Sequence, residues 1–216
     1  MQWRAGTVVE QVRRWPGAVE YSVALDEAAD PPVRALAYTA MVGEPAAGER
    51  VLLNASALLR GLGTGGLAFV VARTDHLPAD PETGPGHIVK ARYTPMQQLP
   101  LAVDEPDSPH HADLADADDL AGMPVVVADL HSALPAVLAG IRSTHPHARV
   151  AYVMTDGGAL PAAFSRAVAG LADAGWLAST ITVGQAFGGD HEAVTTHTGL
   201  LAARFVVGAD VAVVTQ

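Results

Sequence analysis

Acidic and imidazole side chains follow three apolar runs in the C-terminal half of the chain. The runs cover residues 123–130, 149–156 and 179–185, and the residues expected to carry the chemistry are Asp129, His131, Asp156, Asp190 and His191. Carboxylates and imidazoles can move protons near neutral pH or hold a divalent cation. The pattern predicts a catalytic site in which His131 is the general base and Asp129 orients it or binds a metal. No HxxxH or HExxH spacing supports a preformed zinc site, so the sequence leaves a metal cofactor open.

Small and polar residues accompany these groups and are expected to bind the ligand. Glycine pairs that lead into helices let a ligand approach exposed backbone N–H groups, which favours an anion. The expected ligand is therefore a small phosphorylated or nucleotide-like molecule. The predicted ligand-binding residues are Ser132, Thr155, Gly157, Gly158, Gln185, Gly188 and Gly189.

Each residue also has a purely structural interpretation. Asp190 and Ser132 could be helix N-caps, and Asp156 could satisfy the turn at its own position. His197 falls on an apolar stripe with Leu201, which predicts a packed histidine. The recurrence of glycine and acid or histidine after three strands nevertheless exceeds what turns require, which favours a ligand site.

The elements that must position these residues alternate between strand and helix. Strands are predicted at 123–130, 149–156, 179–185 and 210–216, and helices at 132–146, 159–175 and 190–208. This alternation predicts a doubly wound parallel α/β domain, Rossmann-like, over residues 120–216. Ligands in such folds bind at the carboxyl ends of the strands, where the candidate residues are expected to meet.

The N-terminal part, residues 1–103, has a different pattern. Short apolar runs at 6–12, 18–25, 33–42, 49–56 and 67–73 are separated by glycine and proline turns. This spacing predicts a small barrel-like β-domain, because closure removes exposed strand edges. A stack of hairpins against the second domain would give the same pattern.

Two motifs in this part resemble ligand-binding motifs, but their sequence context favours a structural role. The run from Gly61 to Gly66 matches G-x-G-x-x-G, but a β-type run follows it where a dinucleotide site needs a helix, so a turn or bulge is predicted. Lys90 is the only lysine, and with Arg92 it lies on one face of a predicted strand. Together they could grip an anion, although two solvated charges are the favoured interpretation.

The net charge of -10 over 216 residues is concentrated in one segment. Residues 104–119 hold seven acids and no base, whereas the flanking parts balance to -1 and -2. An acidic, self-repelling segment rich in proline predicts an extended linker between domains 1–103 and 120–216. Neither part has the basic stripe of a nucleic-acid binder.

Composition excludes further classes. The chain has no cysteine, which removes thiol catalysis and thiolate zinc sites. It has neither an apolar run long enough to span a membrane nor a signal layout at its start, so a soluble cytoplasmic protein is expected. The apolar surplus with 5% aromatic residues is compatible with a homo-oligomer.

Four segments together resemble a known bacterial family, catalogued as domain of unknown function 3866. They are residues 155–168, 184–203, 122–135 and 62–72, and the resemblance runs from Gly6 to Gln216. The family has no established activity, so the resemblance implies no catalytic residues. It does imply that similar members continue into a glycine-rich stretch, which leaves a shortened chain, or a partner that completes the site, as expectations.

Three functions remain open at this point. The first is a hydrolase or transferase that acts on a small phosphorylated or nucleotide-like substrate at the carboxyl edge of the C-terminal sheet. The second is a non-catalytic small-molecule-binding or regulatory protein, and the third is an oligomeric scaffold.

Overall fold

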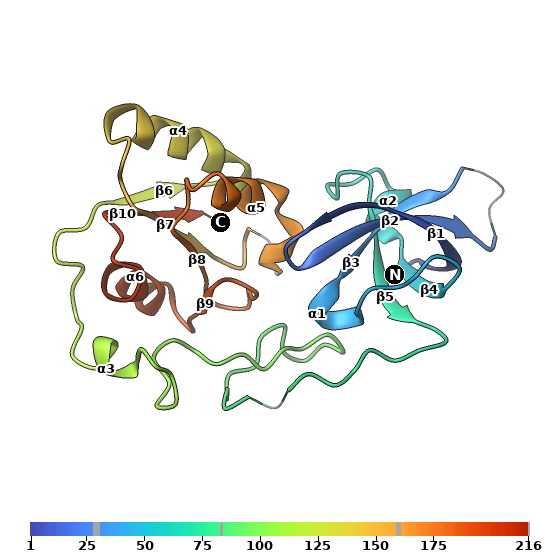
Figure 1. The fold of residues 1–216 in the computed structure, drawn as a ribbon, viewed down its shortest axis with the longest axis horizontal. Helices are drawn as coiled ribbons and strands as arrows, with labels where there is room; N and C mark the ends of the chain where they lie inside the picture. The colour runs from blue at the N-terminus through green and yellow to red at the C-terminus, as the bar shows by residue number, and fades with distance from the viewer. Residues whose placement is uncertain (28–30, 83, 159–160, 216) are drawn as a thin grey trace. The chain divides into compact units, whose positions relative to one another are not determined.

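The computed structural model describes residues 1–27, 31–82, 84–158 and 161–215, which form two compact units, Met1–Glu82 and Thr83–Gln216. Each unit has its own sheet, and helices accompany the strands, so the chain is a mixed α/β protein (Figure 1). The boundary differs from the expected one: residues 83–119 belong to the second unit.

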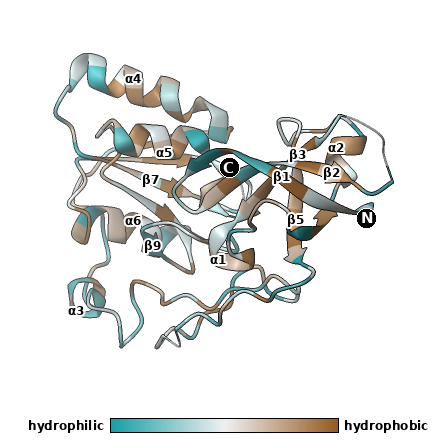
Figure 2. Cartoon of the chain, turned by 45° about the vertical axis from the view of Figure 1, so that its right-hand side comes forward, coloured by the Kyte–Doolittle hydropathy of each residue, from teal (hydrophilic) through white to brown (hydrophobic). Residues whose placement is uncertain are grey.

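The first unit is a closed five-stranded barrel, as its spacing of turns predicts. Its strands are β1 (Trp3–Trp15), β2 (Ala18–Leu25), β3 (Val33–Tyr38), β4 (Arg50–Asn54) and β5 (Ala68–Arg73), in the order β1-β2-β3-β5-β4. The β1–β4 pair closes the barrel, and β3–β5 is its one parallel pair among the described strands. Figure 2 shows the apolar colouring of β3 and β5, whose side chains fill the interior. Two single-turn helices, α1 (Thr39–Val42) and α2 (Ser56–Leu59), lie between strands.

The glycine-rich run is a turn, as its context predicts. It lies between α2 and β5, and Gly61, Gly63, Gly65 and Gly66 all have positive φ. Glycine adopts this conformation at little cost, so the four glycines serve the backbone. A strand follows the run, which removes the helix that a dinucleotide site would need.

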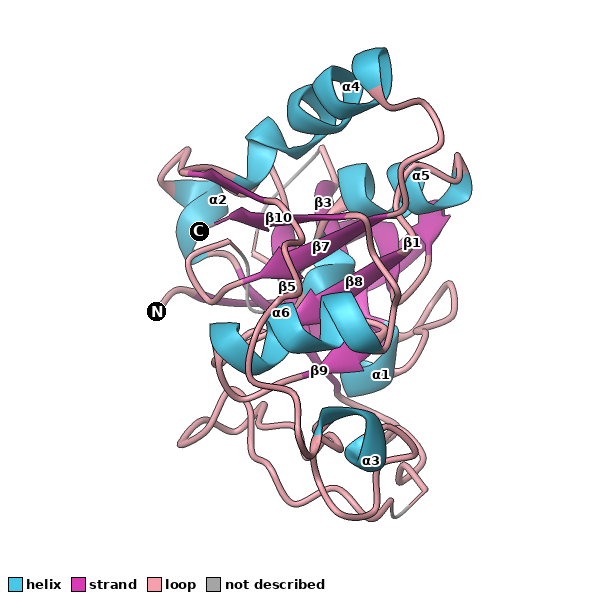
Figure 3. Cartoon of the chain, turned by 90° about the vertical axis from the view of Figure 1, so that its left-hand side faces the viewer, coloured by secondary structure: helices cyan, strands magenta, loops and turns pink. Residues whose placement is uncertain are grey.

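The second unit contains an all-parallel sheet with helices on both faces. The strand order is β6 (Val125–Ala128), β10 (Val211–Thr215), β7 (Val150–Met154), β8 (Ser179–Thr182) and β9 (His191–Glu192). Helices α4 (Leu134–Thr144) and α5 (Arg166–Asp173) cover one face, and α6 (Thr196–Phe205) covers the other (Figures 1 and 3).

Alternation along β7 explains the two layers. Tyr152 and Met154 pack with Leu138 of α4, whereas Val153 packs with Leu201 of α6. A strand that is apolar on both faces needs cover on both, which is why the central strands carry valine-rich runs. The same arrangement sends all the carboxyl ends of the strands to one edge of the sheet.

The interpretation of residues 104–119 as an extended linker is wrong. The segment folds into turns and a short helix, α3 (His111–Leu114), and Leu114 belongs to the core beneath α6. Val103 is in the same core, and its N–H donates to the carbonyl of Glu192 at 2.7 Å. Six of the seven acidic residues of the segment are exposed, and the carboxylate of Glu105 accepts from the N–H groups of His87 and Ala102. A few apolar residues are enough to dock the segment.

Several helix boundaries also differ from expectation. The predicted helix 190–208 is instead a short strand, β9, followed by α6, and its N-cap is Thr195 rather than Asp190. The predicted helix 132–146 begins as a 3₁₀ turn, η1 (His131–Ala133), and α4 follows Ala133, so Ser132 does not cap it. Of the predicted helix 159–175, residues 159 and 160 lie outside the described residues.

The remaining part of that predicted helix begins later than expected. Pro161 is extended, a 3₁₀ turn η2 (Ala162–Phe164) follows, and α5 starts after its N-cap Ser165. The predicted last strand reaches Gln216, which also lies outside the described residues. Within the described part of the chain, no helix combines the length and apolar character needed to cross a membrane.

Candidate functional site

A histidine between two hydroxyl groups lies at the carboxyl edge of the second unit's sheet. His131 follows β6, and its Nε2 lies 2.6 Å from the Oγ of Ser165. Its Nδ1 lies 2.6 Å from the Oη of Tyr152, which in turn lies 2.6 Å from the Oγ1 of Thr215. The four side chains form one hydrogen-bonded row, with His131 from the turn after β6, Tyr152 from the middle of β7, Thr215 from the end of β10 and Ser165 from the start of α5.

Local structure fixes each member of this row. Ser165 is the N-cap of α5, and its Oγ accepts a hydrogen bond from the N–H of Val168 at 3.1 Å. Tyr152 lies on β7 with its ring wholly buried among the side chains of α4 and α5, and Thr215 is buried at the end of β10. The imidazole of His131 is therefore held from both sides by groups that cannot move away.

Burial sets the protonation of the two titratable groups. Burial of His131 lowers the pKa of its imidazole below the ordinary value, so the ring is neutral at neutral pH and can accept a proton. Burial of Tyr152, which outweighs its hydrogen bond to Thr215, raises its pKa to about 12, so the phenol stays protonated. In one polarity of the row, Ser165 donates to Nε2, Nδ1–H donates to Tyr152, and Tyr152 donates to Thr215.

This geometry places a hydroxyl on each side of one imidazole ring. A serine hydroxyl within hydrogen-bond reach of a neutral imidazole, which a third group orients, is the arrangement that activates serine for attack. The expected role of Asp129 as the orienting group is wrong, because Tyr152 and Ser165 occupy both ring nitrogens of His131. Asp129 and Ser132 are exposed beside the row.

A second cluster joins the ends of β7 and β8. The Oδ2 of Asp156 accepts a hydrogen bond from the N–H of Gln185 at 3.2 Å. The other carboxylate oxygen lies where a Cβ on Gly184 would have to be, and Gly184 has a φ of 66°. The Oε1 of Gln185 accepts from the N–H of Arg92 at 3.1 Å. Asp156 and Gln185, predicted from different strands, therefore do come together.

The turn after β7 holds the other predicted ligand-binding residues of this edge. The Oγ1 of Thr155 donates to the carbonyl of Thr215 at 3.0 Å, which ties the turn to β10. The N–H of Gly158 donates to the carbonyl of Thr155 at 3.0 Å, so Gly157 and Gly158 close the turn. Thr155 and the glycine pair thus lie at the edge where the sequence places them.

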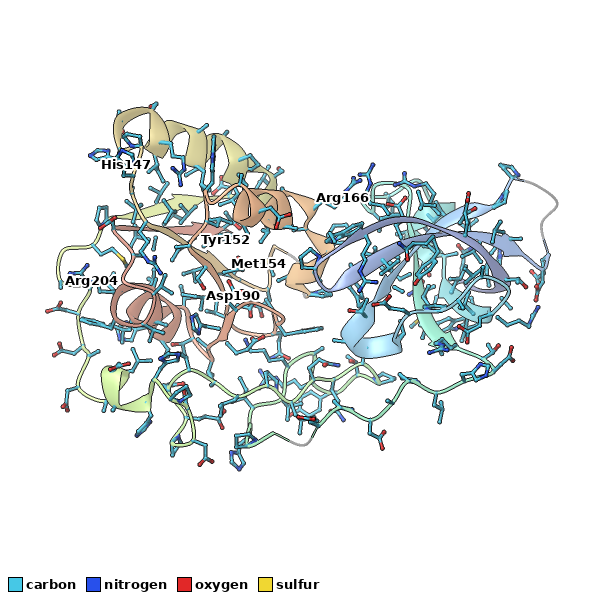
Figure 4. All side chains as sticks on the ribbon, viewed as in Figure 1. His147, Tyr152, Met154, Arg166, Asp190 and Arg204 are labelled. Carbon is cyan, nitrogen blue, oxygen red and sulfur yellow. The ribbon has the colours of Figure 1, made fainter. Side chains whose placement is uncertain are left out.

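Asp190 and His191 do not join this edge, contrary to expectation. Residues 183–190 form a loop that returns alongside β8, so that Asp190 lies beside Thr180 and β9 then pairs in parallel with Ile181 and Thr182. The Oδ2 of Asp190, which is labelled in Figure 4, accepts from the N–H of Thr180 at 2.8 Å. His191 lies edge-on to His110 with ring centroids 5.3 Å apart. Burial is the main reason that the pKa of His191 is lowered.

The glycines before β9 have backbone roles. The N–H of Gly188 donates to the Oε1 of Glu192 at 2.6 Å. A Cβ on Gly189 would lie 2.7 Å from the carbonyl oxygen of Thr180, so only glycine lets the loop approach β8 this closely. Neither glycine leads into a helix, which removes the argument that they cradle an anion.

Lys90 is buried, and the interpretation as a solvated charge is wrong. The residue is 1% exposed, and its Nζ donates to the carbonyls of Thr182 (2.9 Å) and Ala186 (2.7 Å) and to the Oε2 of Glu192 (2.7 Å). Burial lowers the pKa of Lys90, and Glu192 opposes that shift. The segment around Lys90 is also not the predicted strand, since only an isolated bridge to Gln98 forms.

Two further expectations concern histidine and metal. His197 is exposed in the first turn of α6 rather than packed, because the buried face of the helix is formed by Gly199 and the residues 201–203. Among the residues that the structure describes, no group of three or more histidine, aspartate or glutamate side chains is arranged to hold a metal ion. The donor set at the carboxyl edge therefore does not fit a preformed divalent-cation site.

Sequence reasoning missed Ser165, Tyr152 and Thr215. Ser165 had one usable signal, because a serine directly before an apolar helical stretch is a typical N-cap. Tyr152 is the one large polar ring in its strand, which indicates a partner for its hydroxyl. Thr215 carries no signal of its own, since only the strand order places it beside Tyr152.

Comparison with known proteins identifies the family but no activity. No match is found among curated proteins or among solved structures. Residues 34–216 match the family described as protein of unknown function (DUF3866), a span that takes in β3, β4 and β5 of the barrel and the whole second unit. The chain therefore belongs to the DUF3866 family, as the resemblance of its four segments indicates.

Proposed function

We propose that this protein is a hydrolase or transferase that acts on a small phosphorylated or nucleotide-like substrate, with Ser165 as the nucleophile and His131 as the general base. The observation that carries the proposal is the position of His131, whose two ring nitrogens lie 2.6 Å from Ser165 and 2.6 Å from Tyr152. A neutral imidazole with these partners can take the serine proton and return it to a leaving group.

The reaction proceeds in two steps. The Oγ of Ser165 attacks the phosphorus atom, its proton moves to the Nε2 of His131, and the bond between phosphorus and the leaving oxygen breaks. The leaving oxygen takes the proton from Nε2. In the second step, water attacks the phosphoserine and gives its proton to Nε2, which returns it to Oγ as phosphate leaves. In a transferase, an acceptor hydroxyl takes the place of water.

Tyr152 holds the tautomer that this reaction needs. Its protonated phenol can accept from the Nδ1–H of His131 while it donates to Thr215, which leaves Nε2 unprotonated toward Ser165. The low polarity around the buried phenol strengthens this hydrogen bond. We assign Tyr152 as a positioning residue, because it acts through His131 rather than on the substrate.

Two features support a small, anionic substrate. Ser165 begins α5, and the first turn of a helix presents N–H groups and the positive end of its dipole to an anion. Ser165 is 6% exposed, which favours a small electrophile over a polymer. We also propose that the second unit is Rossmann-like in its use, since ligands of parallel sheets with helices on both faces bind at this edge.

A fluorophosphonate probe tests the proposal without knowledge of the substrate, because it phosphonylates activated serines. We expect one adduct on Ser165, located by peptide mass spectrometry, and none in Ser165→Ala. In His131→Gln we expect the labelling rate of Ser165 to fall by about 10²-fold or more. Ser143→Ala, which removes an exposed hydroxyl on α4, is the matched control and should label like wild type. Turnover of p-nitrophenyl phosphate against p-nitrophenyl acetate separates phosphoryl from acyl transfer.

A folded wild-type protein that gains no adduct on Ser165 would overturn the catalytic assignment. The row would then serve to pin α4 and α5 to the sheet, and the non-catalytic binding role would stand in its place. A thermal-shift screen with nucleotides and sugar phosphates would examine that role directly.

A further inference from the structure

We infer that Lys90 is a positioning residue for Ser165, acting through the loop 183–190 between β8 and β9. The inference rests on the proposed function, since it concerns how the proposed nucleophile is held. It assigns a role to the chain's only lysine, which contacts none of the residues of the hydrogen-bonded row.

The ammonium of Lys90 binds residues before, within and after this loop. Its three N–H groups meet three acceptors, which are the carbonyl of Thr182 before the loop, the carbonyl of Ala186 within it, and the carboxylate of Glu192 after it. An ammonium has three donors and no acceptor, so its hydrogen-bonding capacity is fully used. The same carboxylate of Glu192 accepts from the N–H of Gly188 and from the Oγ1 of Thr182.

The loop in turn holds the segment that precedes Ser165. Phe187, the residue after Ala186, forms a parallel bridge with Pro161, and its carbonyl accepts from the N–H of Ala162 at 2.8 Å. The carbonyl of Ala162 accepts from the N–H of Ser165 at 3.0 Å. Every step from Lys90 to Ser165 is therefore a hydrogen bond or a peptide bond.

The other end of the β7–α5 connection is held by the same loop. Gln185, which precedes Ala186, donates its N–H to Asp156 at the end of β7. Asp156 and Ala162 are thus fixed to neighbouring residues of one loop, and Lys90 binds that loop between them. Loss of the ammonium would take from the carbonyl of Ala186 its donor and from the carboxylate of Glu192 its cation, while Thr182 keeps the N–H of Ala193. A carbonyl and a charge left without this partner in a buried place favour rearrangement of the loop.

Backbone strain on the lysine segment fits a positioning role. Ala91 and Tyr93 have φ values of 48° and 63°, a region that residues with a side chain adopt at a cost. These two residues flank Arg92, whose N–H donates to the Oε1 of Gln185. The strained backbone therefore lets the segment meet the loop at two points, the Nζ of Lys90 and the N–H of Arg92.

The test compares Lys90→Met, which keeps the length of the side chain and removes its donors, with wild type. We expect amide hydrogen exchange to rise at least tenfold at Ala162 and Gln185 and to stay unchanged in the barrel, for example at Val51. We expect the fluorophosphonate labelling rate of Ser165 to fall by about tenfold or more, because small misplacements of a reacting group are costly. Arg13→Met, which removes an exposed cation from β1, is the matched control.

A double variant separates positioning from general stability. Lys90→Met with Glu192→Gln removes the charge that the single variant would leave buried and unpaired, and it keeps an oxygen that can accept from the N–H of Gly188. We expect its thermal midpoint to recover toward wild type while exchange at Ala162 stays fast and labelling of Ser165 stays slow.

Two results would overturn the inference. One is unchanged exchange at Ala162 and unchanged labelling in a folded Lys90→Met protein. The other is exchange that rises evenly over the second unit, which would make the lysine a general stabiliser. If wild type gives no Ser165 adduct but Lys90→Met still loosens Ala162 and Gln185, the proposed reaction fails while the hold of Lys90 on the loop survives.

Discussion

The imidazole of His131 and the hydroxyl of Ser165 are 34 residues apart in the chain and 2.6 Å apart in the fold. Each follows a parallel strand and opens a helical segment, η1 for His131 and α5 for Ser165. Since α4 and α5 lie on the same face of the sheet, their starting turns face each other across the carboxyl edge. The contact is therefore a product of strand order, and its two residues carry no shared motif.

Removal of one hydroxyl tests the row as a structural unit. We expect Tyr152→Phe to lower the free energy of unfolding by about 1–3 kcal/mol, because it leaves buried groups of His131 and Thr215 without a partner. Urea unfolding followed by circular dichroism measures the change. Tyr93→Phe, at a position 96% exposed, should leave the midpoint where it is. Equal stability of Tyr152→Phe and wild type would contradict the burial argument.

The lowered pKa of His131 predicts a pH dependence of stability. Below its ordinary pKa of about 6.5, the unfolded state binds a proton that the folded state resists, so stability falls as pH decreases from about 6.5 toward the folded pKa. Above about pH 6.5 this contribution is fully present. Urea unfolding should give a lower free energy of unfolding at pH 5 than at pH 7.5. The difference between the two pH values should be smaller in His131→Gln than in wild type. His191, whose pKa is lowered in the same direction, supplies the remainder.

The docked acidic segment predicts a large effect from one apolar residue. We expect Leu114→Ala to cost about 2–5 kcal/mol of unfolding free energy, because Leu114 belongs to the core beneath α6. An extended linker would tolerate the change. Leu77→Ala, at a residue that is 90% exposed, is the control and should be near neutral. Thermal unfolding of the three proteins at one concentration decides between a docked segment and a linker.

The close contact of α6 with the sheet predicts an effect of one added methyl group. A Cβ on Gly199 would lie 2.6 Å from a methyl carbon of Val183 and 3.3 Å from one of Val153. We expect Gly199→Ala to destabilise by about 1–3 kcal/mol through overpacking. Gly140→Ala in α4 meets open space and should instead stabilise by about 0.5–1 kcal/mol, as alanine favours helix. A thermal midpoint of Gly199→Ala at or above that of wild type would show that the helix can shift freely.

The fold was more predictable from the sequence than the site was. Valine-rich runs predicted β6, β7 and β10, and the spacing of turns predicted the barrel, because both signals are local. Asp190 shows where locality fails: an aspartate followed by residues of helical pattern predicts an N-cap, yet it bonds to the backbone of Thr180 in a turn before β9. The pairing of β9 with β8 depends on contacts that no local pattern displays.

The candidate site shows the same limit. The parallel topology puts His131, Asp156 and Gln185 after the carboxyl ends of three strands, but His131 belongs to one hydrogen-bonded row and Asp156 with Gln185 to a second cluster. The partners of His131 were not predicted, because Tyr152 lies within a strand and Ser165 within a predicted helix, and neither carries a motif. In the structure Tyr152 is a core residue and Ser165 a helix cap, and each also contacts the imidazole of His131.

The burial of Lys90 gives this chain an internal reporter. Because no other lysine occurs in the sequence, a reagent that modifies ε-amines has a single target, and that target is sealed while the loop beyond β8 is closed. Reductive methylation also modifies the exposed α-amine of Met1, whose fast reaction serves as the reference. The slower rate at Lys90 therefore reports how often this part of the protein opens, and the ¹³C-methyl signal of the modified lysine can be followed by NMR. Opening of the second unit can therefore be measured through the amine of Lys90, which is buried in the folded protein.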